Sequence, residues 1–253
     1  MKVSAAIITH DNAAALDRCL ATLAWCEEIL VLDQHSTDQT ADVCARHGAR
    51  LEQTEWLGFG PTKQKAADLC RNRWVLSIDS DERVTPELRD AIAALPDEPE
   101  AAAFAINRLS RFLGQWIRHC GWHPDWIVRL FDRERAGFDG KLVHEAIEAR
   151  GPVARLGGLL HHDAYESMEQ YIAKLDRYTT AAAEELHAQG RRCGPAGAVV
   201  RAQATFWRMW ILQGGILDGW AGTMLCHSSA FYVLSKYAKL WRLGRPDAGP
   251  DRS

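Results

Sequence analysis

The first half of the chain alternates short, uniformly apolar runs with stretches that have the apolar spacing of an amphipathic helix. Uniformly apolar runs are typical of strands that are buried on both faces of a parallel sheet. The predicted strands are Val3–Thr9, Glu28–Asp33, Arg50–Glu52 and Trp74–Ile78. The predicted helices are Ala13–Leu23, a segment that ends at His47, and a segment that begins at Pro61. This alternation predicts an α/β fold with a Rossmann-like, mostly parallel sheet.

The second half of the chain contains fewer strands and ends in helices. The predicted elements are strands at Ala102–Leu109, Ile127–Phe131 and Ala154–His161 and a long helix at Ser167–Ala188. Ser167 is suited to cap the start of that helix. Beyond Pro195 the chain has the pattern of further helices, which are rich in tryptophan.

The expected domains follow from these elements. The polar segment 96–100 indicates a boundary near the middle of the chain. We expect one domain over residues 1–190, with halves at 1–100 and 101–190, and a C-terminal helical extension over residues 191–253.

The charges are distributed unevenly along the chain. The net charge is −3, but residues 191–245 carry eight basic residues against the single acid Asp218, so this segment is +7 and the remainder −10. Such a segment suits an anionic partner, such as a membrane surface or an acidic glycolipid. Lys236, Lys239 and Arg242 recur at every third position, which on a helix makes one cationic stripe. The alternative is that these helices pack on the rest of the chain or on a second copy of it.

The cysteines and the apolar runs bear on the compartment. The seven cysteines are scattered without a C-x-x-C pair, which argues against a zinc site and against a secreted disulfide framework. Val3–Thr9 is too short for a signal peptide, and no run reaches the ~18 uninterrupted apolar residues of a membrane-spanning helix. We therefore expect a cytoplasmic protein that is held peripherally on the inner face of the cell membrane.

Two of the predicted strands end in aspartate. Asp33 ends one strand, and Asp79, Ser80 and Asp81 follow the apolar core of another. Because the carboxyl ends of parallel strands lie at one edge of a sheet, these carboxylates are expected to face the same crevice. Two aspartates one residue apart repel each other, and Mg²⁺ or Mn²⁺ relieves the repulsion while it binds phosphate oxygens. The Asp-x-Asp motif therefore indicates a metal that holds a diphosphate.

A solvated turn is the alternative interpretation of this motif. Thr85 and Pro86 are suited to the N-cap and the first position of a following helix, so the carboxylates could simply precede that helix. The first strand is not followed by G-x-G-x-x-G, which argues against a nicotinamide or flavin dinucleotide.

Several ordered motifs together resemble one enzyme family. They are Glu28–Asp33 with Ser36–Thr40, Trp56–Gln64, Leu76–Glu82, Trp126–Phe131, Val143–Glu145 and Lys236–Trp241. With these motifs the sequence resembles the inverting glycosyltransferases of family 2, which have fold type A. More narrowly, it resembles the bacterial lipopolysaccharide-core β-glucosyltransferase group. The resemblance runs nearly from end to end of the chain, with a nucleotide-binding half at 1–100 and an acceptor half at 101–190.

The resemblance implies roles for individual residues. Asp33 is expected to hold the uracil or ribose of the donor. Asp81 is expected to bind Mg²⁺ or Mn²⁺ on the diphosphate, with His162 as a further metal ligand. Asp79 is expected to support Asp81 or to contact the ribose of the donor. Glu145 is expected to be the catalytic base that takes a proton from the acceptor hydroxyl.

Further donor contacts are expected in the first loop and near the Asp-x-Asp motif. The remaining residues that we assign to donor binding are Thr9, Asp11, Lys63 and Ser80. Lys63 precedes the motif and is suited to neutralise phosphate, although a solvated position is the usual fate of a single lysine. The first loop reads His10-Asp11-Asn12, whereas relatives usually have Lys-Asn-Glu, so the carboxylate lies one place earlier here.

Asp125 is the rival candidate for the base. It follows Trp122, His123 and Pro124, and an acid among aromatic rings can have its pKa raised by burial. A turn residue is the plain alternative for Asp125. A different class of function is a sugar-nucleotide-binding or nucleotidyltransferase-type relative, although the latter would carry a Gly-rich loop with a basic residue after the first strand.

The resemblance also implies the partners of the protein. We expect a nucleotide-sugar donor, UDP-hexose, and a glycolipid acceptor of the lipopolysaccharide inner core. Another lipid-linked glycan or a protein is the alternative acceptor. We expect no nucleic-acid partner.

Overall fold

The computed structural model describes residues 1–139, 145–165 and 167–245. The chain divides into two compact units. Unit 1 comprises Met1–Leu109 and Pro124–His162, and unit 2 comprises Ser110–His123 and Asp163–Ser253.

A nine-stranded sheet forms the frame of unit 1, with strand order β3-β2-β1-β4-β8-β6-β11-β5 and β7 paired to β6. Its strands are β1 (Val3–Thr9), β2 (Glu28–Asp33), β3 (Arg50–Gln53), β4 (Trp74–Asp79), β5 (Glu82–Val84), β6 (Ala103–Phe112), β7 (Gln115–Trp116), β8 (Asp125–Asp132) and β11 (Val153–Tyr165). A separate two-stranded sheet pairs β9 (Ala136–Phe138) with β10 (Ile147–Ala149).

The first four strands of the sheet are parallel, and the strands that follow them are antiparallel. In the parallel part, Thr9 of β1 lies opposite Asp33 of β2, and Ile8 lies opposite Asp79 of β4. The register therefore brings both strand-end aspartates to one edge of the sheet. This confirms the predicted Rossmann-like sheet and the shared edge.

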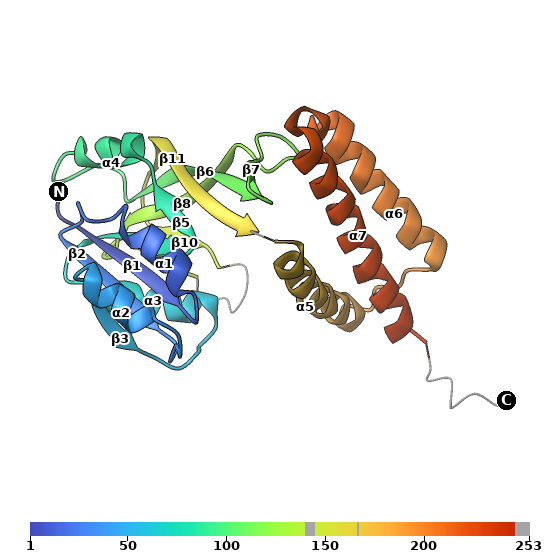
Figure 1. The fold of residues 1–253 in the computed structure, drawn as a ribbon, viewed down its shortest axis with the longest axis horizontal. Helices are drawn as coiled ribbons and strands as arrows, with labels where there is room; N and C mark the ends of the chain where they lie inside the picture. Colours follow the sequence, from blue (N-terminus) through green and yellow to red (C-terminus); the bar gives the residue numbers. More distant parts are fainter. Residues whose placement is uncertain (140–144, 166, 246–253) are drawn as a thin grey trace. The chain divides into compact units, whose positions relative to one another are not determined.

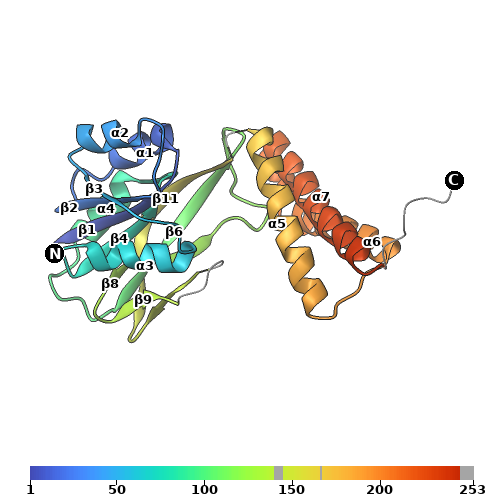
Figure 2. The ribbon, with the colours of Figure 1, turned by 90° about the horizontal axis from the view of Figure 1, so that it is seen from below.

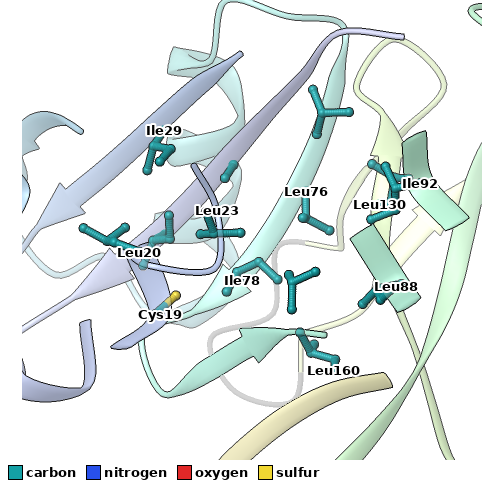
Figure 3. Close-up of a cluster of buried hydrophobic side chains, with 14 of the residues drawn as sticks. Cys19, Leu20, Leu23, Ile29, Leu76, Ile78, Leu88, Ile92, Leu130 and Leu160 are labelled. Carbon is teal, nitrogen blue, oxygen red and sulfur yellow. The ribbon is translucent and has the colours of Figure 1, made fainter. Parts of the chain in front are cut away.

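Helices cover both faces of the parallel strands (Figure 2). They are α1 (Ala13–Leu20), α2 (Thr40–Arg46), α3 (Phe59–Leu69) and α4 (Pro86–Ala93). One apolar layer joins α1, α2 and α4 to the sheet, and Figure 3 shows Leu20, Leu76 and Leu88 within it. The other layer joins α3 to the opposite face. Ala5 and Ile7 of β1 enter the first layer and Ala6 and Ile8 the second, which explains the uniformly apolar strands.

Unit 2 is built mainly from helices. They are α5 (Met168–Ala188), α6 (Pro195–Trp207) and α7 (Gly219–Leu243), with the π-helical turn η1 (Arg208–Leu212) and the 3₁₀ turn η2 (Gly215–Asp218) between α6 and α7. Figure 1 shows α6 and α7 side by side. Buried Phe112, Tyr171 and Leu225 are part of a core that includes the start of unit 2, α5 and α7. Among the described residues, no helix is both long enough and apolar enough to cross a bilayer.

The packing of α5 on α7 changes one expectation for the basic tail. Lys239 does not belong to a free cationic stripe, because its Nζ lies 2.7 Å from the Asp176 carboxylate and donates to the Thr179 and Thr180 hydroxyls. These partners lie on α5, which the expected boundary at residue 190 assigned to the first domain. By its contacts α5 belongs to unit 2, while the division of function among 1–100, 101–190 and 191–253 stays a prediction.

Local signals set several element ends as expected. Ser167 and Thr85 accept hydrogen bonds from the N–H groups of Gln170 and Leu88, so both predicted caps are confirmed. Helix α3 begins at Phe59 rather than Pro61, since Gly58 takes φ +95° just before it.

Strands β6 and β11 run past their predicted ends, to Phe112 and Tyr165. Both cross from unit 1 into unit 2, which a pattern of local hydrophobicity does not indicate.

Two adjacent glycines in β11 give a test of this packing. Gly158 has φ +84°, and a Cβ there would lie 2.3 Å from the backbone nitrogen of Leu88, whereas a Cβ on Gly157 would meet nothing within 4 Å. Gly158→Ala is expected to lower the free energy of unfolding by about 3 kcal/mol, and Gly157→Ala by less than about 1 kcal/mol. Urea unfolding of both variants measures the difference, and equal losses would contradict it.

Candidate active site

The Asp-x-Asp motif forms a tight turn between β4 and β5. Asp79 ends β4, and its N–H donates to a Glu82 carboxylate oxygen at 3.0 Å, which closes the turn. The Ser80 hydroxyl accepts from the Asn12 side-chain amide at 3.1 Å, so the motif is tied to the first loop of the sheet edge. The motif is therefore held on both sides and is not a free solvated turn.

Seven side chains of alternating charge extend from this turn, and we name them the charge chain. In order they are Glu145, Lys63, Asp79, Arg129, Glu82, Arg108 and Asp125. All seven lie in unit 1. The two candidate bases, Glu145 and Asp125, are the two ends of the charge chain.

Lys63 joins the first end of the charge chain to the Asp-x-Asp motif. Its Nζ lies 2.7 Å from Asp79 Oδ1 and 2.7 Å from Glu145 Oε1. The Lys63 side chain is only 6% exposed, so the lysine is buried and paired, not solvated. Glu145 is described, whereas Val143 and His144 of the same motif lie outside the described residues. The Glu145 carboxylate is thus linked to the motif through Lys63.

Arg129 and Arg108 carry the charge chain to its other end. Arg129 Nη2 lies 2.5 Å from Asp79 Oδ2 and 2.7 Å from Glu82 Oε1. Arg108 lies 3.4 Å from Glu82 Oε1 and 2.8 Å from Asp125 Oδ2. The Asp125 side chain is 34% exposed, so this candidate base is more accessible to solvent than Glu145, which is 17% exposed.

Burial and charge oppose each other at the centre of the charge chain. Burial by itself raises the pKa of Asp79, but Arg129 and Lys63 together hold that pKa well below its usual range. Burial likewise lowers the pKa of Arg129, and Asp79 and Glu82 raise it above its ordinary value. Both groups therefore stay ionised. Both Asp79 oxygens are taken by protein cations, which leaves Asp81 as the member of the motif that can meet a ligand.

The structure brings the two predicted metal ligands, Asp81 and His162, close together. His162 Nε2 on β11 lies 3.6 Å from Asp81 Oδ2, and the two side chains are 18% and 26% exposed. Within the described ranges, no group of three His, Cys, Asp or Glu side chains is placed to hold a metal ion. One carboxylate and one imidazole fit a Mn²⁺ or Mg²⁺ ion whose remaining ligands come from a diphosphate and water.

The expected nucleotide side of the site lies at the ends of β1 and β2. The Asp33 carboxylate accepts from the Ser36 N–H at 3.0 Å and from the Ser36 hydroxyl at 2.5 Å. Asp11 Oδ1 accepts from the Thr37 N–H at 2.6 Å. Thr9 is buried, and its hydroxyl has no hydrogen-bond partner in the part of the chain that the structure describes. These residues share one edge of the sheet with the Asp-x-Asp motif.

Sequence reasoning assigned no role to three members of the charge chain, Glu82, Arg108 and Arg129. Glu82 and Arg129 stand within recognised motifs, at Leu76–Glu82 and Trp126–Phe131, so a signal was present for those two. No local pattern marks Arg108 on β6.

The depressed pKa of Asp79 gives a prediction about acid stability. A carboxylate whose pKa is lower in the folded than in the unfolded chain contributes stability above its unfolded pKa of about 3.9, and this is lost as the pH falls below that value. Asp79→Asn is expected to lower the free energy of unfolding by about 2 kcal/mol at neutral pH, because Arg129 and Lys63 lose a counter-ion. The variant should also lose less stability than wild type between about pH 4 and pH 2. Urea unfolding at several pH values tests this, and parallel profiles would contradict it.

Comparison with other sequences gives a family match over more than half of the chain. The profile of glycosyl transferase family 2 matches residues 4–150. The lipopolysaccharide core biosynthesis glycosyltransferase LpsC of Rhizobium meliloti is 28% identical over 99% of this chain and 96% of its own length. An uncharacterized glycosyltransferase of Rickettsia bellii is 26% identical over 94% of this chain and 87% of its own length.

Solved structures share the fold. The mannosyltransferase PcManGT from Pyrobaculum calidifontis, in complex with GDP-Man and Mn²⁺, matches with a TM-score of 0.54 at 15% identity, over 94% of this chain and 86% of that one. S. aureus TarS 1-349 in complex with UDP matches with a TM-score of 0.51 at 16% identity, over 96% and 90%. The sheet and its helices have the arrangement of fold type A. By the profile match over residues 4–150, the chain belongs to glycosyltransferase family 2.

Proposed function

We propose that this glycosyltransferase moves a hexose from a nucleotide-sugar, UDP-hexose, to a hydroxyl of a lipopolysaccharide inner-core glycolipid, with inversion at the anomeric carbon. The observation that carries the proposal is the junction at Lys63, where the Glu145 carboxylate and the Asp-x-Asp motif meet at 2.7 Å each. The similarity to LpsC over almost the whole chain supports the acceptor class. The two solved structures that share the fold are bound to UDP and to GDP-Man, which supports a nucleotide-sugar donor.

The donor is held at the edge of the sheet where β1, β2 and β4 end. Asp33 lies at the nucleotide end of this edge, and Thr9, Asp11 and Ser80 line the path toward the diphosphate. Asp81 and His162 are the residues that would hold a divalent cation, Mg²⁺ or Mn²⁺. When bound, that ion neutralises charge on the departing nucleoside diphosphate.

Glu145 is the base in this proposal. Its carboxylate takes the proton of the acceptor hydroxyl while the hydroxyl oxygen forms a bond to the anomeric carbon. The bond from that carbon to the diphosphate oxygen breaks on the opposite face, and the electron pair leaves with the nucleoside diphosphate. Glu145 shares Lys63 with Asp79, and this link between its carboxylate and the Asp-x-Asp motif supports the proposed role. Asp125 is the reserve because it ends the same charge chain and is more exposed.

A panel of nucleotide-sugars with Mg²⁺ or Mn²⁺, scored for nucleoside diphosphate release in the presence of inner-core glycolipid, tests the donor and the acceptor. UDP-hexose is expected to give the fastest release, and release should require the acceptor. Release that is equally fast without any acceptor would contradict transfer to a glycan.

Asp81→Ala tests the metal contact. The variant is expected to lower turnover by at least about 10²-fold and to abolish the part of nucleoside diphosphate affinity that depends on the cation. Asp90→Ala on the surface of α4 removes an exposed carboxylate elsewhere in unit 1 and serves as the control, with unchanged turnover. Wild-type activity that persists in excess chelator would overturn the assignment.

Glu145→Gln and Asp125→Asn distinguish the two ends of the charge chain. Glu145→Gln keeps the shape of the side chain and removes its basicity, so kcat is expected to fall by ~10²–10⁴ with little change in donor binding. Asp125→Asn should retain kcat within about tenfold. Single-turnover rates and calorimetric donor binding measure the two effects separately. The base is Asp125 if the Gln variant turns over normally and the Asn variant does not.

A further inference from the structure

The turn between α6 and α7 exposes large apolar side chains, and we name residues 207–220 the hairpin tip. The exposed fractions are 50% for Trp207, 56% for Ile211, 81% for Leu212, 51% for Ile216, 72% for Leu217 and 74% for Trp220. Soluble proteins rarely gather such side chains within one short segment unless it meets a partner or a membrane.

The hairpin tip is ordered by contacts to the start of unit 2. The Asp218 carboxylate accepts from the backbone N–H groups of Arg118 and His119 at 3.1 and 2.8 Å, and from the His119 ring at 2.8 Å. The Cys120 N–H donates to the Gln213 carbonyl at 2.9 Å. The apolar side chains are therefore held out by a fixed backbone.

Close backbone packing adds to this rigidity. A Cβ on Gly222 would lie 2.2 Å from the Gly215 carbonyl oxygen, and a Cβ on Gly215 would lie 2.6 Å from Cys226 Sγ. Only glycine permits this approach of η2 to α7. The tight turn directs Ile216 and Leu217 outward while Leu225 stays in the core.

The charges around the hairpin tip suit an anionic surface. Asp218 is the single acid of residues 191–245, and its side chain is only 5% exposed because it holds the turn. Arg208 within the tip and Arg118, whose backbone N–H binds Asp218, are both exposed. Tryptophan favours the boundary between lipid headgroups and acyl chains, and arginine favours anionic headgroups. Trp207 and Trp220 are the first and last residues of the tip. This arrangement is expected for a segment that enters a membrane from one side, with tryptophan at the headgroups and the residues between them deeper.

The predicted stripe of Lys236, Lys239 and Arg242 lies elsewhere in unit 2. These residues belong to the last part of α7, beside the start of α6, where Leu240 and Trp241 share a pocket with Arg192 and Gly194. The hairpin tip is at the other end of the same helix pair. The apolar surface is thus separate from the stripe, and Lys239 is already bound to α5.

We propose that the hairpin tip inserts into the interface of a membrane that contains anionic lipids, with Leu212 and Leu217 deepest and Trp207 and Trp220 at the headgroups. This inference goes beyond the proposed transfer reaction. It requires no spanning helix, in agreement with the described helices. A second copy of the chain or another protein is the competing occupant, and the experiment separates these outcomes.

Vesicle flotation of the full chain tests the insertion. Wild type is expected to float with vesicles of phosphatidylcholine and phosphatidylglycerol, and more weakly with phosphatidylcholine alone. The Leu212→Asp/Leu217→Asp variant should lower the partition coefficient by about 100-fold, since burial of each leucine side chain contributes about tenfold or more. The matched control is Ile172→Asp/Val200→Asp, which alters two residues of α5 and α6 that are 54% and 66% exposed. The control should bind vesicles like wild type.

Two further measurements distinguish membrane insertion from failure of the proposed reaction. Tryptophan fluorescence with brominated lipids should show quenching in wild type and less quenching in Trp220→Phe. Nucleoside diphosphate release with a detergent-dispersed acceptor should be unchanged in the Leu212→Asp/Leu217→Asp variant, so loss of docking is separable from failure of the proposed reaction. Absence of flotation by wild type, or a dimer in sedimentation that only this variant dissociates, would overturn membrane insertion.

Discussion

The Arg129 guanidinium, buried between the carboxylates of Asp79 and Glu82, is the contact on which the site in unit 1 depends. Removing an ion from water costs several kcal/mol, and only close partners offset that cost. Arg129 comes from β8, whereas its partners come from β4 and β5, so the ion pairs fix the positions of three strands around the Asp-x-Asp motif. Lys63 and Arg108 then neutralise the remaining charge and carry the charge chain to the two candidate bases.

This arrangement makes the two aspartates of the motif unequal. Asp79 is committed to Lys63 and Arg129, so it supports the turn, and its charge is fixed. Asp81 lies 3.6 Å from His162, a longer contact than those of Asp79, and its side chain is 26% exposed, which suits a carboxylate that binds a cation on a diphosphate. The same ion pairs explain why the acid-stability prediction concerns Asp79, whereas the proposed donor contact is assigned to Asp81.

In unit 2, too, a buried carboxylate fixes the shape of a turn. Asp218 is buried and bonded to the backbone of Arg118 and His119, and this carboxylate holds an apolar turn in a fixed shape. A buried polar contact thus keeps large apolar side chains exposed to water, although the hydrophobic effect favours their burial. In the proposed reaction the acceptor is a glycolipid, and the proposed insertion of the rigid apolar tip would bring the enzyme to the membrane that holds it.

The features that could be predicted from the sequence are those that arise from residues close together along the chain. Local periodicity predicted the strands β1 and β2, and capping residues predicted the starts of α4 and α5. The rule that parallel strands end at one edge of a sheet predicted that Asp33 and Asp79 lie at the same edge. Three other features came from the folded chain: the burial of Lys63 between Asp79 and Glu145, the contact of Lys239 with Asp176, and the exposure of the hairpin tip. The Lys63–Glu145 pair spans 82 positions. Such contacts arise from strand order, register and helix packing, and these are settled by burial over the whole chain, which no short window of sequence contains.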